Sequence, residues 1–93
     1  MENFTISRTE ETEDKWTFEV GLNSCSYKVV LDKDYLADLA DESVEPEVLI
    51  RASFEFLLER EPASSILAEF EMPVIQDYFP EYETVMRKRL NSQ

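Results

Sequence analysis

The chain has 93 residues, a formal net charge of −12, one cysteine and no histidine. The lack of histidine removes the usual proton-transfer side chain and the commonest metal ligand, and a single glycine excludes a glycine-rich phosphate-binding loop. Twenty-one acidic residues against nine basic ones make a nucleic-acid backbone or an anionic membrane an unfavourable partner. We therefore expect one globular domain over residues 1–93, with no metal and no cofactor.

Two segments with alternating apolar residues predict a β-hairpin. Residues 15–22 and 25–31 alternate with a period of two, which is typical of strands buried on one face. Asn23 and Ser24 lie between them, and a two-residue turn at this point fixes the register. On the outer face this register places Glu19 opposite Lys28, where we expect a salt bridge. The predicted pairs on the apolar face are Trp16 with Leu31, Phe18 with Val29, Val20 with Tyr27 and Leu22 with Cys25.

A further strand is expected at about residues 3–9, with Phe4 and Ile6 on the same apolar face. The acidic stretch 10–14 is polar throughout and predicts a solvated hairpin loop. Together the strands form a three-stranded antiparallel β-meander with one apolar face. Such a sheet is stable only when another element covers that face.

Helical periodicity after residue 32 predicts four or five helices that supply the cover. They are expected at about residues 33–41, 46–60, 63–70, 74–79 and 80–90, with prolines marking several of the boundaries. The segment 46–60 is apolar around most of its circumference, so we expect it to lie on the sheet with other helices at its flanks. In segment 63–70, we expect Ile66, Leu67 and Phe70 to face inward. The predicted fold is α+β, with the helices packed on one sheet face.

Cys25 is the strongest nucleophile in the chain and lies in an alternating apolar segment. An activated thiolate needs positive charge nearby, and Lys28 is the single basic neighbour in this segment. We therefore interpret Cys25 as a small core residue. A small enzyme that uses Cys25, or Asp, Glu and Tyr side chains in a pocket that the sequence does not locate, is the alternative.

The segment from Asp77 to Glu83 combines aromatic and acidic residues around a proline. Tyrosine and phenylalanine are common anchors at protein interfaces, and they are also ordinary core residues where two helices meet. Both interpretations stay open from the sequence. The candidate partner-binding residues are Asp77, Tyr78, Phe79, Glu81, Tyr82 and Glu83.

Three stretches of the second half carry a resemblance. They are Arg51-Ala-Ser-Phe-Glu-Phe-Leu-Leu-Glu-Arg-Glu-Pro62, Ser65-Ile-Leu67 and Tyr78-Phe-Pro-Glu-Tyr-Glu83, about a third of the chain. This pattern resembles short bacterial proteins of uncharacterised function. The resemblance implies a recurring fold, and no activity or site residue comes with it.

The charge favours a small acidic, non-catalytic interaction or regulatory module that binds a basic protein. A net charge of −12 on a small surface attracts such a partner over a distance of about 8 Å at physiological salt. The alternative is that the acidity maintains solubility and that the partner contact is apolar. The first residues lack the basic and apolar regions of a signal peptide, so we expect a cytoplasmic location.

Overall fold

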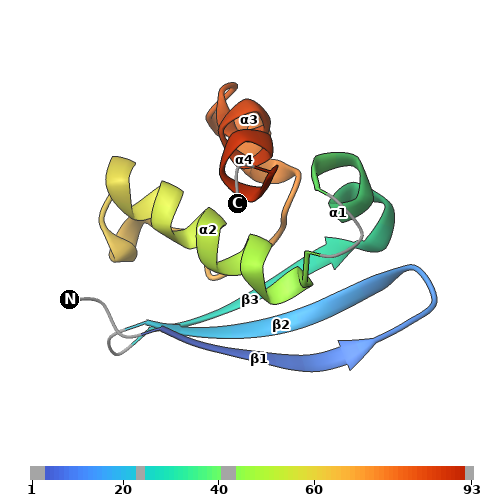
Figure 1. The fold of residues 1–93 in the computed structure, drawn as a ribbon. Coiled ribbons are helices and arrows are strands. Elements are labelled where there is room, and N and C mark those ends of the chain that lie inside the picture. Colours follow the sequence, from blue (N-terminus) through green and yellow to red (C-terminus); the bar gives the residue numbers. More distant parts are fainter. Residues whose placement is uncertain (1–3, 23–24, 41–43, 92–93) are drawn as a thin grey trace.

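A four-stranded sheet carries the helices on one of its faces (Figure 1). The computed structural model describes residues 4–22, 25–40 and 44–91. The strand order is β1-β2-β3-β4, so β1 and β4 form the two edges. The elements are β1 (Phe4–Glu11), β2 (Lys15–Leu22), β3 (Cys25–Asp32), α1 (Lys33–Leu39), α2 (Pro46–Arg60), a 3₁₀ turn (Ala63–Ser65), β4 (Glu69–Glu71), α3 (Val74–Tyr78) and α4 (Tyr82–Asn91).

The hairpin of β2 and β3 has the predicted register. Phe18 pairs with Val29, Val20 with Tyr27, and Leu22 with Cys25. The turn residues 23 and 24 lie outside the described residues. The alternation places Phe18, Val20, Leu22, Tyr27, Val29 and Leu31 in the core. The prediction is wrong for Cys25, which is exposed at the first position of β3, next to the turn end of the hairpin.

Strand β1 is longer than predicted and contains an irregularity. It continues to Glu11 and pairs antiparallel with β2, with a shift in register between Arg8 and Glu10. An extra residue in one strand of a pair changes the face to which the following side chains point. Arg8 lies opposite Phe18, and after the shift Glu11 lies opposite Trp16. The acidic residues 10 and 11 therefore belong to the strand and not to a loop.

The prediction of a helix at 63–70 is wrong. The chain forms one 3₁₀ turn at Ala63–Ser65 and then strand β4, which pairs parallel with β3. Glu69 and Glu71 are exposed while Phe70 is buried, so this short stretch follows the strand period. The physical reason is tertiary, because the free edge of β3 gains a hydrogen-bonded partner that the local pattern does not reveal. Lys28 was expected to form a salt bridge with Glu19. In the structure, its Nζ atom instead lies 3.7 Å from the carboxylate of Glu69 on β4.

Helix α2 has the predicted boundaries and forms the centre of the core. Phe54 and Phe56 are completely buried. The ring of Phe54 contacts Tyr27 of the sheet edge-on, with centroids 5.4 Å apart. The other helices differ from the prediction at their ends: α1 ends at Leu39, α3 ends at Tyr78 and α4 begins at Tyr82. Residue 41 of the first predicted helix and residue 3 of the first predicted strand lie outside the described residues.

Candidate functional site

The aromatic and acidic segment from Asp77 to Glu83 is divided between the core and the surface. Tyr82 is fully buried, and its hydroxyl lies 2.6 Å from the hydroxyl of Ser53 on α2. Phe79 is half-buried, and its ring packs edge-on against Phe56 with centroids 5.8 Å apart. Tyr78 is 64% exposed. The two interpretations of this segment therefore apply to different residues, because Phe79 and Tyr82 belong to the core and Tyr78 stays accessible.

The side chain of Gln76 fixes the turn that presents Tyr78. Its Nε2 atom donates to the carbonyl of Pro80 at 2.6 Å, and its Oε1 atom accepts from the backbone N–H of Glu83 at 2.9 Å. These bonds tie α3 to the first turn of α4, where backbone N–H groups lack partners within the helix. Since Tyr78 is the last residue of α3, its position on the surface is fixed by the same bonds.

The acidic side chains of the segment differ in their surroundings. A hydrogen bond from its own backbone and then one from Arg60 lower the pKa of the Glu81 carboxyl, with Arg60 Nε 3.2 Å away. Glu83 accepts a hydrogen bond from the Tyr35 hydroxyl at 2.9 Å. Burial and then this bond raise the pKa of Tyr35. Asp77 is exposed and takes part in no ion pair of the described residues.

An apolar groove lies beside Tyr78, between the end of α2, strand β4 and helix α3. Its volume is about 310 Å³. The residues that give it its apolar character include Leu57, Ile66, Leu67, Phe70, Ile75 and Tyr78. Glu61 is the one charged side chain in its lining within the described part of the chain. The groove combines a hydrophobic wall with negative charge.

Exposed large apolar side chains are concentrated in this groove. Val48, Leu67 and Tyr78 are the large hydrophobic residues that stay exposed within ranges 4–22, 25–40 and 44–91, and Leu67 and Tyr78 both line the groove. The expectation that Leu67 faces inward is wrong, because the segment is not helical and Leu67 is 46% exposed. Clustered exposed apolar side chains mark interaction sites more often than scattered ones do.

The basic side chains lie mostly in ion pairs with acids elsewhere on the surface. Arg60 and Arg89 both contact Glu59, and Lys33 lies 2.7 Å from Glu11. Other pairs join Arg8 to Glu47, Lys15 to Asp32, Lys28 to Glu69 and Arg87 to Asp38. None of the described ion pairs includes Glu61 or Asp77. Glu61 of the groove lining and Asp77, the residue before Tyr78, are therefore outside these ion pairs.

The reactive side chains considered for an enzyme include Cys25 and the buried tyrosines. Cys25 is the first residue of β3, is exposed and does not line the groove. Burial, followed by the neighbouring Cys25 thiol, raises the pKa of the Tyr27 hydroxyl to about 12. Burial also raises the pKa of Tyr82. Tyrosines with raised pKa values are poor proton acceptors at neutral pH. The described residues contain no group of three or more acidic or cysteine side chains placed to hold a metal ion.

Across the ranges that the structure describes, every helix is too short or too polar to cross a membrane. Comparisons with protein-family models, with curated proteins and with solved structures found no match for this chain.

Of the candidate residues in segment 77–83, Tyr78 and Phe79 line the groove. Leu67 and Phe70, which also line the groove, were predicted on the inner face of a helix that does not form. One feature of the sequence could have indicated that Leu67 is exposed. This large apolar residue comes shortly after Pro62 and the two serines Ser64 and Ser65. The groove draws its lining from separate parts of the chain, so no single stretch of sequence contains its pattern.

Proposed function

We propose that this protein is a small, non-catalytic protein-binding module. In this proposal, the groove beside Tyr78 receives apolar side chains from a segment of a basic partner protein. The observation that carries the proposal is that Leu67 and Tyr78, two exposed large apolar residues, line the same groove. Tyrosine anchors in partly enclosed sites are typical of protein interfaces.

The charge of the chain supports a basic partner. A net charge of −12 attracts cations, and Glu61 in the groove lining belongs to none of the described ion pairs. Charge complementarity of this kind raises the rate of association and excludes acidic competitors. The groove itself supplies the apolar contact that keeps the partner bound.

The size of the groove supports a peptide segment as the occupant. Its volume of about 310 Å³ is at the lower end of the range for ligand sites. This space holds a small number of apolar side chains. The rest of a bound segment would lie across the surface, where the surrounding acids contact its basic residues.

The test compares groove variants with a matched surface variant. Tagged protein is used to capture partners from bacterial cell extract at low and high salt. We expect capture of basic proteins that is lost in Leu67→Ser and Tyr78→Ser and kept in Val48→Ser, since Val48 is 44% exposed, close to Leu67 at 46%, but lies outside the groove lining. These surface changes should alter the free energy of unfolding by less than about 0.5 kcal/mol.

The salt dependence of capture distinguishes two roles of the acidic residues, namely recruitment of a partner and solubility. If the negative charge recruits the partner, capture falls steeply as salt rises, because screening shortens the range of attraction. If the acidity serves solubility alone, capture depends on Tyr78 but not on salt. An identical set of captured proteins for the unchanged chain and for Tyr78→Ser would contradict the proposed function.

A further inference from the structure

Strand β4 has one edge that pairs with β3 and one edge that does not. The backbone N–H of Lys28 donates to Ala68 at 2.8 Å, and that of Met72 donates to Val30 at 2.9 Å. Peptide groups of successive residues in a strand point to opposite sides. The N–H and C=O groups of Glu69 and Glu71 therefore point away from β3, and no hydrogen bond among the described residues uses them.

The side chains of β4 connect this free edge to the groove. Phe70 points to the helix side, is buried and lines the groove. Glu69 and Glu71 point to the opposite face of the sheet and are exposed. A strand placed beside β4 would direct every second side chain towards the groove and the others towards these two glutamates.

We propose that the partner segment binds in an extended conformation and adds to the sheet as a strand beside β4, with apolar residues alternating with lysine or arginine. This inference rests on the proposed function and specifies how the groove is used. The apolar residues enter the groove beside Phe70 and Tyr78, while the basic residues contact Glu69 and Glu71. Addition of a strand to a sheet edge supplies affinity through backbone hydrogen bonds and specificity through alternate side chains.

The charges on β4 select against a second copy of the same strand. Two β4 strands placed side by side would bring Glu69 and Glu71 close to identical carboxylates, and like charges at neighbouring positions are destabilising. Charged residues on an exposed edge are a common protection against self-association. A basic segment turns the same charges into favourable contacts.

The experiment uses two heptapeptides of identical composition, with four lysines, two valines and one leucine. One alternates lysine with the apolar residues, and the other places the apolar residues at helical spacing. Binding is measured by fluorescence anisotropy of the labelled peptide. We expect the alternating peptide to bind at least about tenfold more tightly. Amide hydrogen exchange of Glu69 and Glu71 should slow by at least about tenfold in its complex, because their N–H groups gain acceptors.

Two variants of Glu69 separate the contribution of its backbone hydrogen bond to peptide binding from the contribution of its side-chain charge. Glu69→Pro removes the N–H group at the first position of an edge strand, a place where proline is tolerated. Glu69→Gln removes the same charge and keeps the N–H group. We expect Glu69→Pro to bind the alternating peptide at least about tenfold more weakly than Glu69→Gln. The emission spectrum of Trp16, the single tryptophan, reports whether both variants are folded.

The outcomes distinguish this inference from the proposed function. If both peptides bind equally, require Tyr78 and leave the exchange of Glu69 and Glu71 unchanged, the groove binds its partner without strand addition and the inference is wrong. If neither peptide binds, both proposals are contradicted. Should Glu69→Pro lose its fold, the exchange measurement on the unchanged protein decides the result alone.

Discussion

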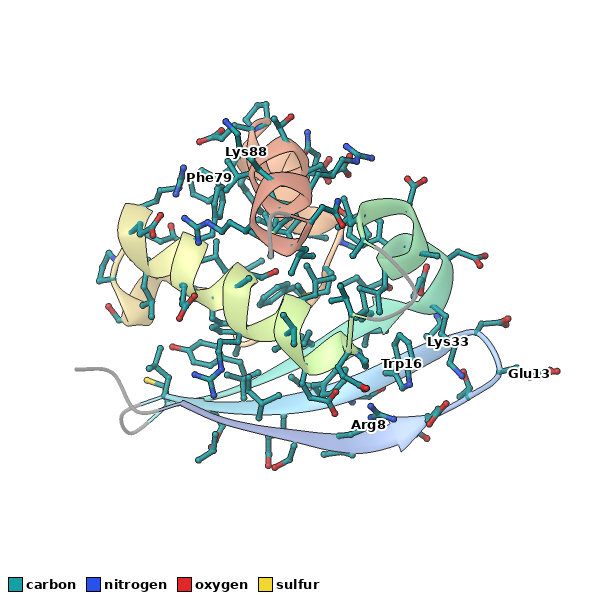
Figure 2. The ribbon with its side chains drawn as sticks, viewed as in Figure 1. Arg8, Glu13, Trp16, Lys33, Phe79 and Lys88 are labelled. Atoms are coloured by element: carbon teal, nitrogen blue, oxygen red, sulfur yellow. The ribbon has the colours of Figure 1, made fainter. Side chains whose placement is uncertain are left out.

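The apolar side chains at the boundary of the core are covered to different extents at two sides of the molecule (Figure 2). At one side, Arg8 and Lys33 lie over Trp16, with 5.6 Å and 5.2 Å from their charged groups to the ring centroid. At the other side, beyond Phe79, the groove leaves Leu67 and Tyr78 exposed. The first side shows how long cationic side chains cover an aromatic ring with their stems and keep their charge in water. At the second side, Arg60 lies over Phe56 with 3.6 Å to the ring centroid, but Leu67 and Tyr78 remain exposed.

The covered side is also closed by ion pairs. Arg8 Nη2 lies 3.0 Å from Glu47 at the start of α2, and Lys33 Nζ lies 2.7 Å from Glu11. These pairs connect the sheet to the helix layer at the position of the β1 irregularity. At the groove side, Arg60 at the end of α2 pairs with Glu81 at 3.2 Å, while Leu67 and Tyr78 of the groove lining stay exposed. The two sides therefore differ in the large apolar side chains that they leave exposed, and not in the presence of cations or ion pairs.

The largest effect is expected behind the groove, at Phe56. Its ring is completely buried between Phe79 and Tyr82, with centroids 5.8 and 5.3 Å away. Phe56→Ala should lower the free energy of unfolding by about 3–5 kcal/mol, because it leaves a cavity in the wall that supports the groove. The measurement is denaturant unfolding followed by Trp16 fluorescence. The neighbouring exposed residue gives the control, and Glu55→Ala should change stability by less than about 0.5 kcal/mol. Equal effects of both variants would show that the groove wall is not part of the core.

A smaller effect is expected at the covered side, in Arg8→Ala. The change removes the cation above Trp16 and Phe18 and the ion pair with Glu47. We expect a loss of about 1–2 kcal/mol, since these groups are partly exposed, and a shift of Trp16 emission to longer wavelength as water reaches the ring. Lys15→Ala is the matched control, because its pair with Asp32 spans 4.0 Å and is exposed. If the two variants behave alike, Arg8 does not close this side and the comparison fails.

The smallest effect concerns protonation at the covered side. A hydrogen bond from Lys33 is the main reason that the pKa of Glu11 lies below its ordinary value. A carboxyl whose pKa is lowered on folding contributes stability above its ordinary pKa and loses that contribution as pH falls through the lowered value. In Lys33→Met, the pKa of Glu11 should rise towards the ordinary value. Carboxyl carbon titration by NMR measures it, with Glu59, whose pKa is lowered first by a hydrogen bond from Arg89, as the unchanged reference. An unchanged Glu11 titration in the variant would contradict the role of Lys33.

Much of the sheet could be predicted because its pairing is local. The turn length, the alternation of Phe18 and Val20, and the matching alternation of Tyr27 and Val29 all point to one register, and that register is confirmed. Strand β4 could not be predicted in this way. Ile66, Leu67 and Phe70 have spacings that also suit one face of a helix, and the partner that decides between the two structures lies far away in the sequence.

The candidate site could be predicted only in part for the same reason. The sequence contains an unusual aromatic segment, but its residues differ in burial. Tyr82 forms a hydrogen bond with Ser53 in the core, whereas Tyr78 is exposed. Ion pairing was similarly non-local, since Lys28 contacts Glu69 and Arg8 contacts Glu47. Side-chain pairs between distant elements depend on the complete fold.

The parallel pairing of β4 has a consequence for the order in which the chain assembles. The strands β1, β2 and β3 follow one another along the chain and can associate soon after they are synthesised. Lys28 meets Glu69 only after about 40 further residues have been added, so closing this long loop costs more conformational entropy than closing the hairpins. The last strand to join the sheet is therefore one of its two edge strands, and a partner strand beside β4 would continue the sheet on the side where the chain adds last.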